Sequence, residues 1–163
     1  MATNGSPQAG IGHVHLKVSD LERSVQFYED ALGMKVMARY GSDAAFLSYG
    51  GYHHHLGLNT WHSKGAGPAP VRAAGLFHFA ILYETRTDLA VALKRVIESG
   101  WTIDGASDHG VSQALYLHDP DFNGVELYWD RPEETWPRNP DGSLGMFTAP
   151  LDLDSLLAEL ERA

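Results

Sequence analysis

Residues 11–22 read IGHVHLKVSDLE, and this stretch places an extended segment directly before a helix start. From Ile11 to Val18 apolar and polar side chains alternate, which is the period of a strand with one buried face. Ser19 and Glu22 can then form a capping box, because a Ser hydroxyl accepts from the third helical N–H while the Glu reaches back. The sequence therefore predicts a strand over 11–18 and a helix that begins after Ser19.

The residues that follow complete a β-α-β-β-β unit. Apolar residues keep 3/4 spacing up to Leu32, and Gly33 is a natural stop for this helix. Three runs with the composition of strands come next, separated by Gly-containing turns. They cover residues 35–40, 44–49 and 52–60.

The second half of the chain repeats this order. Thr85 and Asp88 predict a capped helix up to Gly100. Strands are expected at 76–83, 101–104, 113–117 and 124–129. His13 and His78 take the same place near the start of each half, and an internal duplication of this length implies two similar modules around a shared cleft. The predicted fold is α+β, with two paired β-α-β-β-β modules whose curved sheets form a cup around a metal site.

These patterns divide the chain into one domain with two flanking segments. The domain covers 11–130, with module one at 11–60, a Gly- and Pro-containing connection at 61–74, and module two at 75–130. Residues 1–10 are polar and read as a flexible tail. Residues 131–163 form an acidic extension, in which a short helix is expected over 151–160.

Composition limits the chemistry that this domain can perform. With 163 residues and 44% apolar side chains, the chain can bury a core without a disulfide or structural metal. A net charge of −9 without a basic stripe argues against nucleic acid as a partner. The absence of cysteine leaves His, Asp and Glu as metal ligands. A polar start and the lack of a long apolar run predict a cytoplasmic protein that does not interact with a membrane.

Strand alternation selects the residues that face the cup. In their strands, His13, His15, His78 and Glu126 fall on the side opposite the apolar residues. Two histidines and one carboxylate are the composition of a facial triad that holds Fe(II) and leaves coordination positions open. A lone histidine is more often a hydrogen-bonded polar residue than a ligand. An unpaired acid such as Glu126, between apolar neighbours, is costly to bury, and a metal would satisfy it.

Several of these segments resemble the vicinal oxygen chelate superfamily, which includes glyoxalase I, fosfomycin and bleomycin resistance proteins and type I extradiol dioxygenases. The resemblance covers residues 11–130 and is carried by GHVHLKVSDL at 12–21, FHFA at 77–80 and the stretch 119–127. It implies that the metal ligands are His13, His78 and Glu126.

Two further segments favour the extradiol branch of that superfamily. DHGVSQALYL at 108–117 is similar to the dioxygenase stretch that supplies a histidine near the metal site and a substrate-binding tyrosine, here His109 and Tyr116. On the strand at 52–60, extradiol enzymes carry an acid–base histidine where glyoxalase I places a ligand, usually Glu. His55 takes that position, either as the acid–base group or as a metal ligand in a three-His site.

The resemblance implies Fe(II)-dependent cleavage of a small aromatic diol by O2, with Mn(II), Ni(II) or Zn(II) as alternative metals. Two other functions stay open: a glyoxalase-like isomerase or lyase, and a binding or resistance protein that holds an aromatic ligand without turning it over. The two modules can close one cup within a chain or across the two-fold axis of a homodimer.

Overall fold

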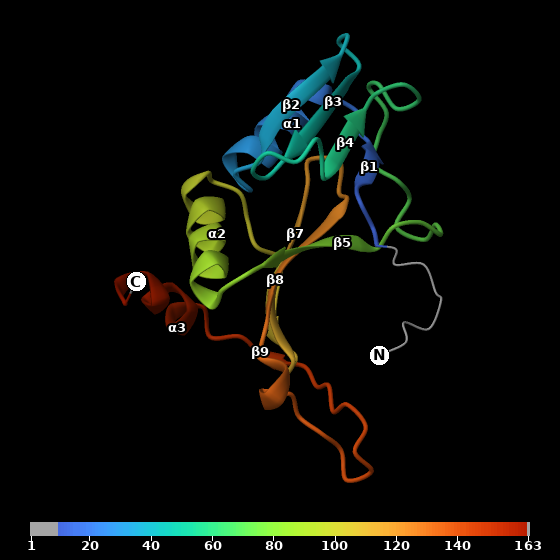
Figure 1. Ribbon diagram of the computed structural model, residues 1–163. Coiled ribbons are helices and arrows are strands. Elements are labelled where there is room, and N and C mark those ends of the chain that lie inside the picture. The colour runs from blue at the N-terminus through green and yellow to red at the C-terminus, as the bar shows by residue number, and fades with distance from the viewer. Residues whose placement is uncertain (1–9, 163) are drawn as a thin grey trace, which may run out of the picture.

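The computed structural model describes residues 10–162, and Figure 1 shows the first module beyond one end of the second. All of the predicted tail except Gly10 lies outside the described residues. The first module contains β1 (Val14–Lys17), α1 (Leu21–Asp30), β2 (Lys35–Tyr40), β3 (Ala44–Ser48) and β4 (Leu56–Asn59). Its sheet has the order β1-β4-β3-β2, in which β1 and β4 are parallel and the other pairs antiparallel.

The second module repeats this arrangement, so the predicted α+β fold with two β-α-β-β-β modules is confirmed. It contains β5 (His78–Tyr83), α2 (Arg86–Glu98), β6 (Gly105–Asp108), β7 (Ser112–His118) and β8 (Gly124–Asp130). The strand order is β5-β8-β7-β6-β9, and β5 and β8 are parallel. The two-residue strand β9 (Ala149–Pro150) comes from the C-terminal extension.

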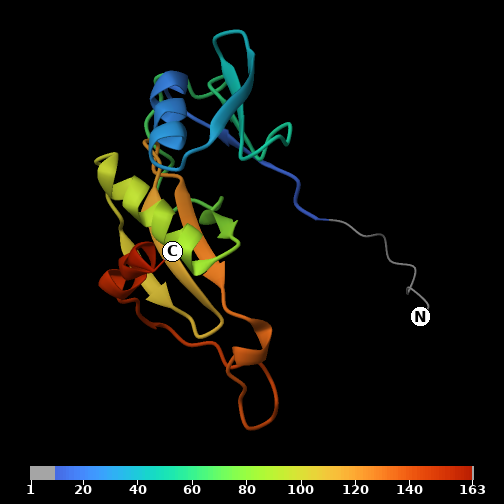
Figure 2. The same cartoon turned by 60° about the vertical axis from the view of Figure 1, so that its left-hand side comes forward.

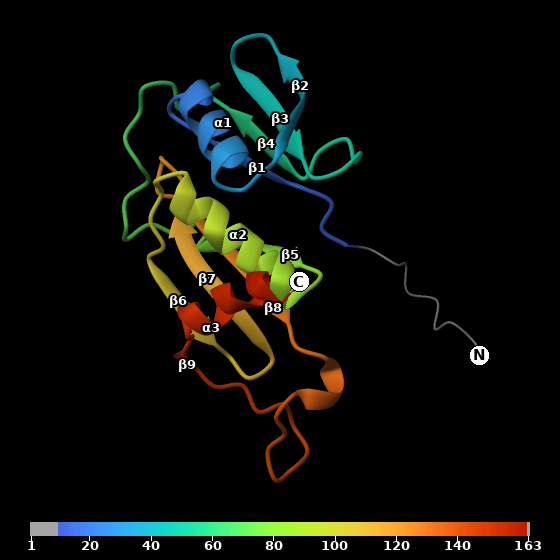
Figure 3. The same ribbon diagram turned by 90° about the vertical axis from the view of Figure 1, so that its left-hand side faces the viewer.

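The C-terminal extension returns to the second module after a loop (Figure 3). A 3-10 turn, Glu133–Thr135, precedes that loop, and α3 (Leu153–Leu157) with the 3-10 turn Ala158–Glu161 ends the chain. The expected helix at 151–160 is therefore a short α-helix continued by a 3-10 turn. Its Leu156 is fully buried against the core. Among the residues described, no helix is both long and apolar enough to cross a membrane.

The two helix starts differ in their capping. At α2 the predicted box is present, because Thr85 accepts from the backbone N–H of Asp88 and the Asp88 carboxylate accepts from Thr85. At α1 the predicted box of Ser19 and Glu22 is wrong. Asp20 is the N-cap residue, accepting from the N–H of Arg23 at 3.1 Å.

A long-range contact explains the different cap at α1. The backbone N–H of Ser19 donates to the Asp121 carboxylate at 3.1 Å, and its hydroxyl donates to the same group at 2.5 Å. Glu22 binds Arg39 on β2 instead of the helix start. Ser19 thus joins the first module to the loop before β8, and the neighbouring Asp20 caps the helix in its place.

Some predicted strands have other bounds. The strand expected at 101–104 is wrong, since pairing begins at Gly105 in β6. Trp101 instead packs its ring edge-on against Phe27 of α1, with centroids 4.9 Å apart. The strands expected at 11–18 and 52–60 are shorter in the structure. Pairing between them is confined to Val14–Lys17 of β1 and Leu56–Asn59 of β4.

The modules share one core through their helices. Figure 2 shows α1 beyond one end of α2. Buried residues of α1, including Phe27 and Tyr28, belong to the same apolar cluster as Leu93 of α2 and Val125 of β8. The Tyr28 hydroxyl, fully buried, donates to Asp119 at 2.9 Å. The two sheets remain separate, since in the described residues no strand of one module pairs with a strand of the other.

We expect Tyr28→Phe to lower the free energy of unfolding by about 1–2 kcal/mol, because it removes a buried hydrogen bond to a charged group and keeps the ring. Tyr40→Phe is the matched control, since Tyr40 is 72% exposed. Urea unfolding of both variants measures the difference. Equal stability of the two variants would show that the Tyr28–Asp119 contact does not hold the modules together.

Candidate active site

Three predicted site residues lie on one face of the second sheet. Tyr116 of β7 stands directly opposite Glu126 of β8, and Glu126 stands opposite Ala80 of β5. His78 precedes Ala80 by two residues and therefore shares its face. The opposite face carries buried leucines and valines of β7 and β8 that belong to the core. The alternation of the strands thus brings a histidine, a carboxylate and a phenol together.

These side chains form a continuous polar chain with His109. The His78 Nε2 atom is 2.9 Å from Glu126 Oε2. The Tyr116 hydroxyl is 3.2 Å from Glu126 Oε1 and 2.8 Å from His109 Nε2. The side chains of His78 and Glu126 are 32% and 14% exposed, so a small molecule can reach both of them.

The environment keeps Tyr116 protonated. Burial raises the pKa of Tyr116 to about 12, and the negative charge of Glu126 and the hydrogen bond to it act in the same direction. Near neutral pH the phenol therefore keeps its single hydrogen, which it can donate to one partner at a time. Whether Glu126 or His109 receives this hydrogen depends on which ring nitrogen of His109 carries a hydrogen of its own.

His109 is held by the turn between β6 and β7. Asp108 accepts from the backbone N–H of Gly110 at 2.8 Å, from the Gln113 amide at 3.0 Å and from Arg131 at 2.5 Å. Gly110 has a φ of 77°, a conformation that favours glycine. Burial alone would raise the pKa of Asp108, but these hydrogen bonds together with the charge of Arg131 lower it below its ordinary value.

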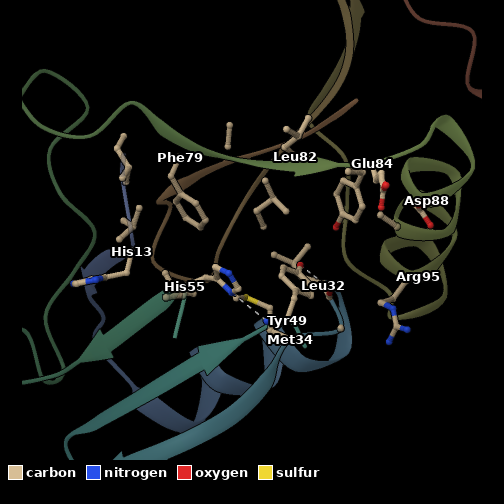
Figure 4. Close-up of a pocket in the computed structure, with 18 of the residues that line it drawn as sticks. His13, Leu32, Met34, Tyr49, His55, Phe79, Leu82, Glu84, Asp88 and Arg95 are labelled. Atoms are coloured by element: carbon tan, nitrogen blue, oxygen red, sulfur yellow. Dashed lines mark hydrogen bonds between the residues drawn. The ribbon is translucent and has the colours of Figure 1, made fainter. Parts of the chain in front are cut away.

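The other two predicted site residues lie in the first module. His13 precedes β1, and its ring centroid is 4.4 Å from that of His54. His55 precedes β4, with its Nδ1 atom 2.9 Å from the Ser48 hydroxyl. Both line a cavity of about 610 Å³ between the modules, and Arg95 lies at its opposite end (Figure 4). Neither His78 nor Glu126 lines this cavity.

The expected convergence of His13, His78 and Glu126 is therefore not found within one chain. Over residues 10–162, no three His, Asp or Glu side chains are placed to hold one metal ion. The reason is the way the modules join, since contact through the helices keeps the two sheets apart.

His78 and Glu126 nevertheless fit part of a metal site. Two ligands that bind one ion at right angles, each with a bond of roughly 2.1 Å, are about 3 Å apart. The 2.9 Å between His78 Nε2 and Glu126 Oε2 matches this separation. One imidazole and one carboxylate suit Fe(II), Mn(II), Ni(II) or Zn(II), and a third protein ligand is needed for a facial triad.

Sequence reasoning missed the residues that support His109. Asp108 stands next to His109 in the sequence, and an acid beside a His-Gly turn is a signal that could have been used. The backbone of Phe147, whose carbonyl oxygen is 3.1 Å from His109 Nδ1, left no such signal. A main-chain contact from 38 positions away has no pattern in the sequence.

Comparison with known proteins agrees with the fold. Residues 10–127 match the model of the Glyoxalase/Bleomycin resistance protein/Dioxygenase superfamily. The chain belongs to this superfamily. A solved superfamily domain from Frankia sp. EAN1pec has a TM-score of 0.64 and 25% identity, covering 77% of this chain and all of that domain.

Two curated relatives in the superfamily carry different activity names. Catechol-2,3-dioxygenase of Bacillus subtilis is 42% identical over 91% of this chain, and the chain spans about half of that protein, 51%. A probable lactoylglutathione lyase of Synechocystis sp. is 28% identical over 71% of this chain and 91% of its own length. Similarity is thus higher to the protein named as a dioxygenase.

We expect Asp108→Asn to destabilise the fold by about 1–2 kcal/mol near neutral pH, because the variant loses the charge that Arg131 and the Gly110 N–H bind. A lowered pKa means that this stabilisation is present above the unfolded-state pKa and is lost as pH falls through the folded-state value. The difference from wild type should therefore shrink below about pH 4. Urea unfolding at several pH values measures it, and a pH-independent difference would contradict the assignment.

Proposed function

We propose that this protein is an Fe(II)-dependent extradiol dioxygenase that opens the ring of a catechol-type diol with O2. The observation that carries the proposal is the chain of contacts from His78 through Glu126 and Tyr116 to His109 on one open sheet face. The 42% identity to a protein named Catechol-2,3-dioxygenase supports it. The chain spans about half the length of that relative, 51%, so the activity in the relative's name enters here as a hypothesis about this chain.

In this proposal His13 of a second copy of the chain completes the metal site. The described chain supplies only His78 and Glu126 on the open face. His13 directly precedes β1 and His78 is the first residue of β5, and both strands are sheet edges. The neighbouring apolar residues Ile11 and Phe77 are 92% and 89% exposed, and exposed apolar groups beside incomplete sites indicate an interface. In a two-fold dimer this arrangement builds two equivalent sites.

His55 would come to the site together with His13. The backbone N–H of Val14 donates to the His55 carbonyl at 3.0 Å, so the two histidines lie side by side, directly before the neighbouring strands β1 and β4 of one module. A second copy that brings His13 to Glu126 therefore brings His55 as well. This geometry keeps His55 available as the acid–base residue or as an additional ligand.

The residues of the site have separate roles in the proposed reaction. Bound Fe(II) would hold both oxygens of the diol and O2 in contact and lower the pKa of the diol. His78, Glu126 and His13 would hold the metal. A neutral His55 would take the proton that the diol loses and return it later, while Tyr116 would form a hydrogen bond to the diol and His109 would hold Tyr116 in position.

The second candidate function is a glyoxalase-like isomerase, which the relative named as a probable lactoylglutathione lyase supports. That chemistry would use a fourth protein ligand on β4 or the residues before it. Residues 52–58 contain three histidines and no acid, which disfavours the usual carboxylate ligand but leaves His55 as an alternative. A binding protein for an aromatic ligand would keep the pocket without metal-dependent turnover.

We expect anaerobic reconstitution with Fe(II), followed by catechol in air, to give a yellow ring-fission product with matching oxygen uptake. His78→Ala and Glu126→Ala should each reduce the rate at least about 100-fold, because each removes a metal ligand. His62→Ala is the control, since His62 is not among the proposed site residues. Bound iron with neither colour nor oxygen uptake would overturn the dioxygenase assignment and favour the isomerase.

We expect mixed dimers to recover activity if two copies build the site. His13→Ala and Glu126→Ala are each inactive alone, but random mixing and exchange should return about one quarter of wild-type activity, since half the dimers then hold one intact site of two. Mixing His78→Ala with Glu126→Ala is the control and should recover nothing, because both changes fall in the same half-site. Absence of recovery in the first mixture, with exchange verified, would place all ligands in one chain.

A further inference from the structure

The loop between Trp136 and Pro150 lies outside the family match and returns to the turn that carries His109. Figures 1 and 3 show it leaving the end of β8 and coming back to the edge of the second sheet as β9. There Ala149 pairs with Asp108 on β6. The neighbouring residues Phe147 and Thr148 therefore lie beside His109.

The Phe147 ring packs directly on the backbone of Gly110. A Cβ atom at Gly110 would be 2.5 Å from Phe147 Cε1 and 2.9 Å from Pro137 Cγ, so a residue with a side chain would displace the loop. The N–H of Phe147 also donates to the His109 carbonyl at 3.3 Å. These contacts fix the Phe147 main chain next to the imidazole.

The main chain of Phe147 limits which ring nitrogen of His109 carries hydrogen. Its carbonyl oxygen is 3.1 Å from His109 Nδ1, and a carbonyl can only accept a hydrogen bond. Nδ1 must therefore be the donor. The Thr148 hydroxyl, 3.3 Å from the same nitrogen, can accept as well. In the neutral ring Nε2 then has no hydrogen and acts as an acceptor.

We propose that the segment Trp136–Pro150 holds neutral His109 as the Nδ1–H tautomer through the Phe147 carbonyl, so that the Tyr116 hydroxyl donates to Nε2. The 2.8 Å distance between Tyr116 and His109 fits this bond. Glu126 Oε1, 3.2 Å from the same hydroxyl, is the competing acceptor for its single hydrogen, and donation to the nearer Nε2 atom turns that hydrogen away from Glu126. The role of this contact in catalysis rests on the proposed function, whereas the tautomer itself does not.

This arrangement gives the proposed site a definite hydrogen-bond direction. A diol hydroxyl on the sheet face can donate a hydrogen bond to the Tyr116 oxygen, and the Tyr116 hydroxyl in turn donates to His109. The opposite tautomer would place a hydrogen on Nε2, which would donate to Tyr116 and direct the phenol hydrogen toward Glu126. Phe147 is thus a positioning residue, which acts through His109 and its neighbour Tyr116.

Nitrogen-15 NMR of the histidine rings tests the proposal on the full chain, both metal-free and with diamagnetic Zn(II). Of the nine histidines, His109 is assigned by the signals that disappear in His109→Gln. We expect the neutral His109 ring to carry its hydrogen on Nδ1, whereas a free imidazole side chain in water prefers Nε2. A neutral His109 with its hydrogen on Nε2 would overturn the proposal.

A pair of glycine variants tests whether the segment selects the tautomer. Phe147→Gly removes the ring from Gly110 and frees the carbonyl, so the fraction of Nδ1–H should fall several-fold. Met146→Gly is the matched control, because Met146 is 62% exposed and adds the same backbone freedom one residue earlier. An unchanged ring spectrum in Phe147→Gly would overturn the role of the segment. Since the spectra need no turnover, they are independent of whether catechol is cleaved.

Discussion

The two-residue period of the second sheet, fixed by burial of one of its faces, determines where the polar groups lie. Leu115 and Leu117 of β7 and Val125 and Leu127 of β8 are almost completely buried in the shared core. A shift of one residue in the pairing would expose them and bury the polar face. Burial therefore holds the register in which Tyr116 faces Glu126.

The join between the modules sets a second constraint. Because α1 and α2 contribute to one core and Tyr28 binds Asp119 across the join, the two sheets are fixed apart rather than face to face. In the function that we propose, each chain thus supplies two half-sites on different modules. This separation is the physical reason why the function that we propose involves a second copy, and why His13 and His55 are proposed to act as one unit.

The predictions that failed concern segments whose conformation depends on a distant partner. The capping box at Ser19 satisfied the local pattern, but Asp121 competes for the same hydroxyl and backbone N–H. Residues 101–104 have the composition of a strand, yet Trp101 packs on Phe27 of the other module. The box at Thr85 has no competing partner in the described structure, and there the local pattern was sufficient.

Sequence alone determined the α+β class, the duplicated module order and the pattern of alternation that puts His78, Glu126 and Tyr116 on one face, because local periodicity and short-range pairing fix these features. Only the tertiary structure decided that His13 lies away from them, and that His109 meets Tyr116 on one side and the Phe147 carbonyl on the other. These contacts depend on how the modules dock and on the path of residues 131–150. Docking is decided by the whole core, and no run of neighbouring residues encodes it.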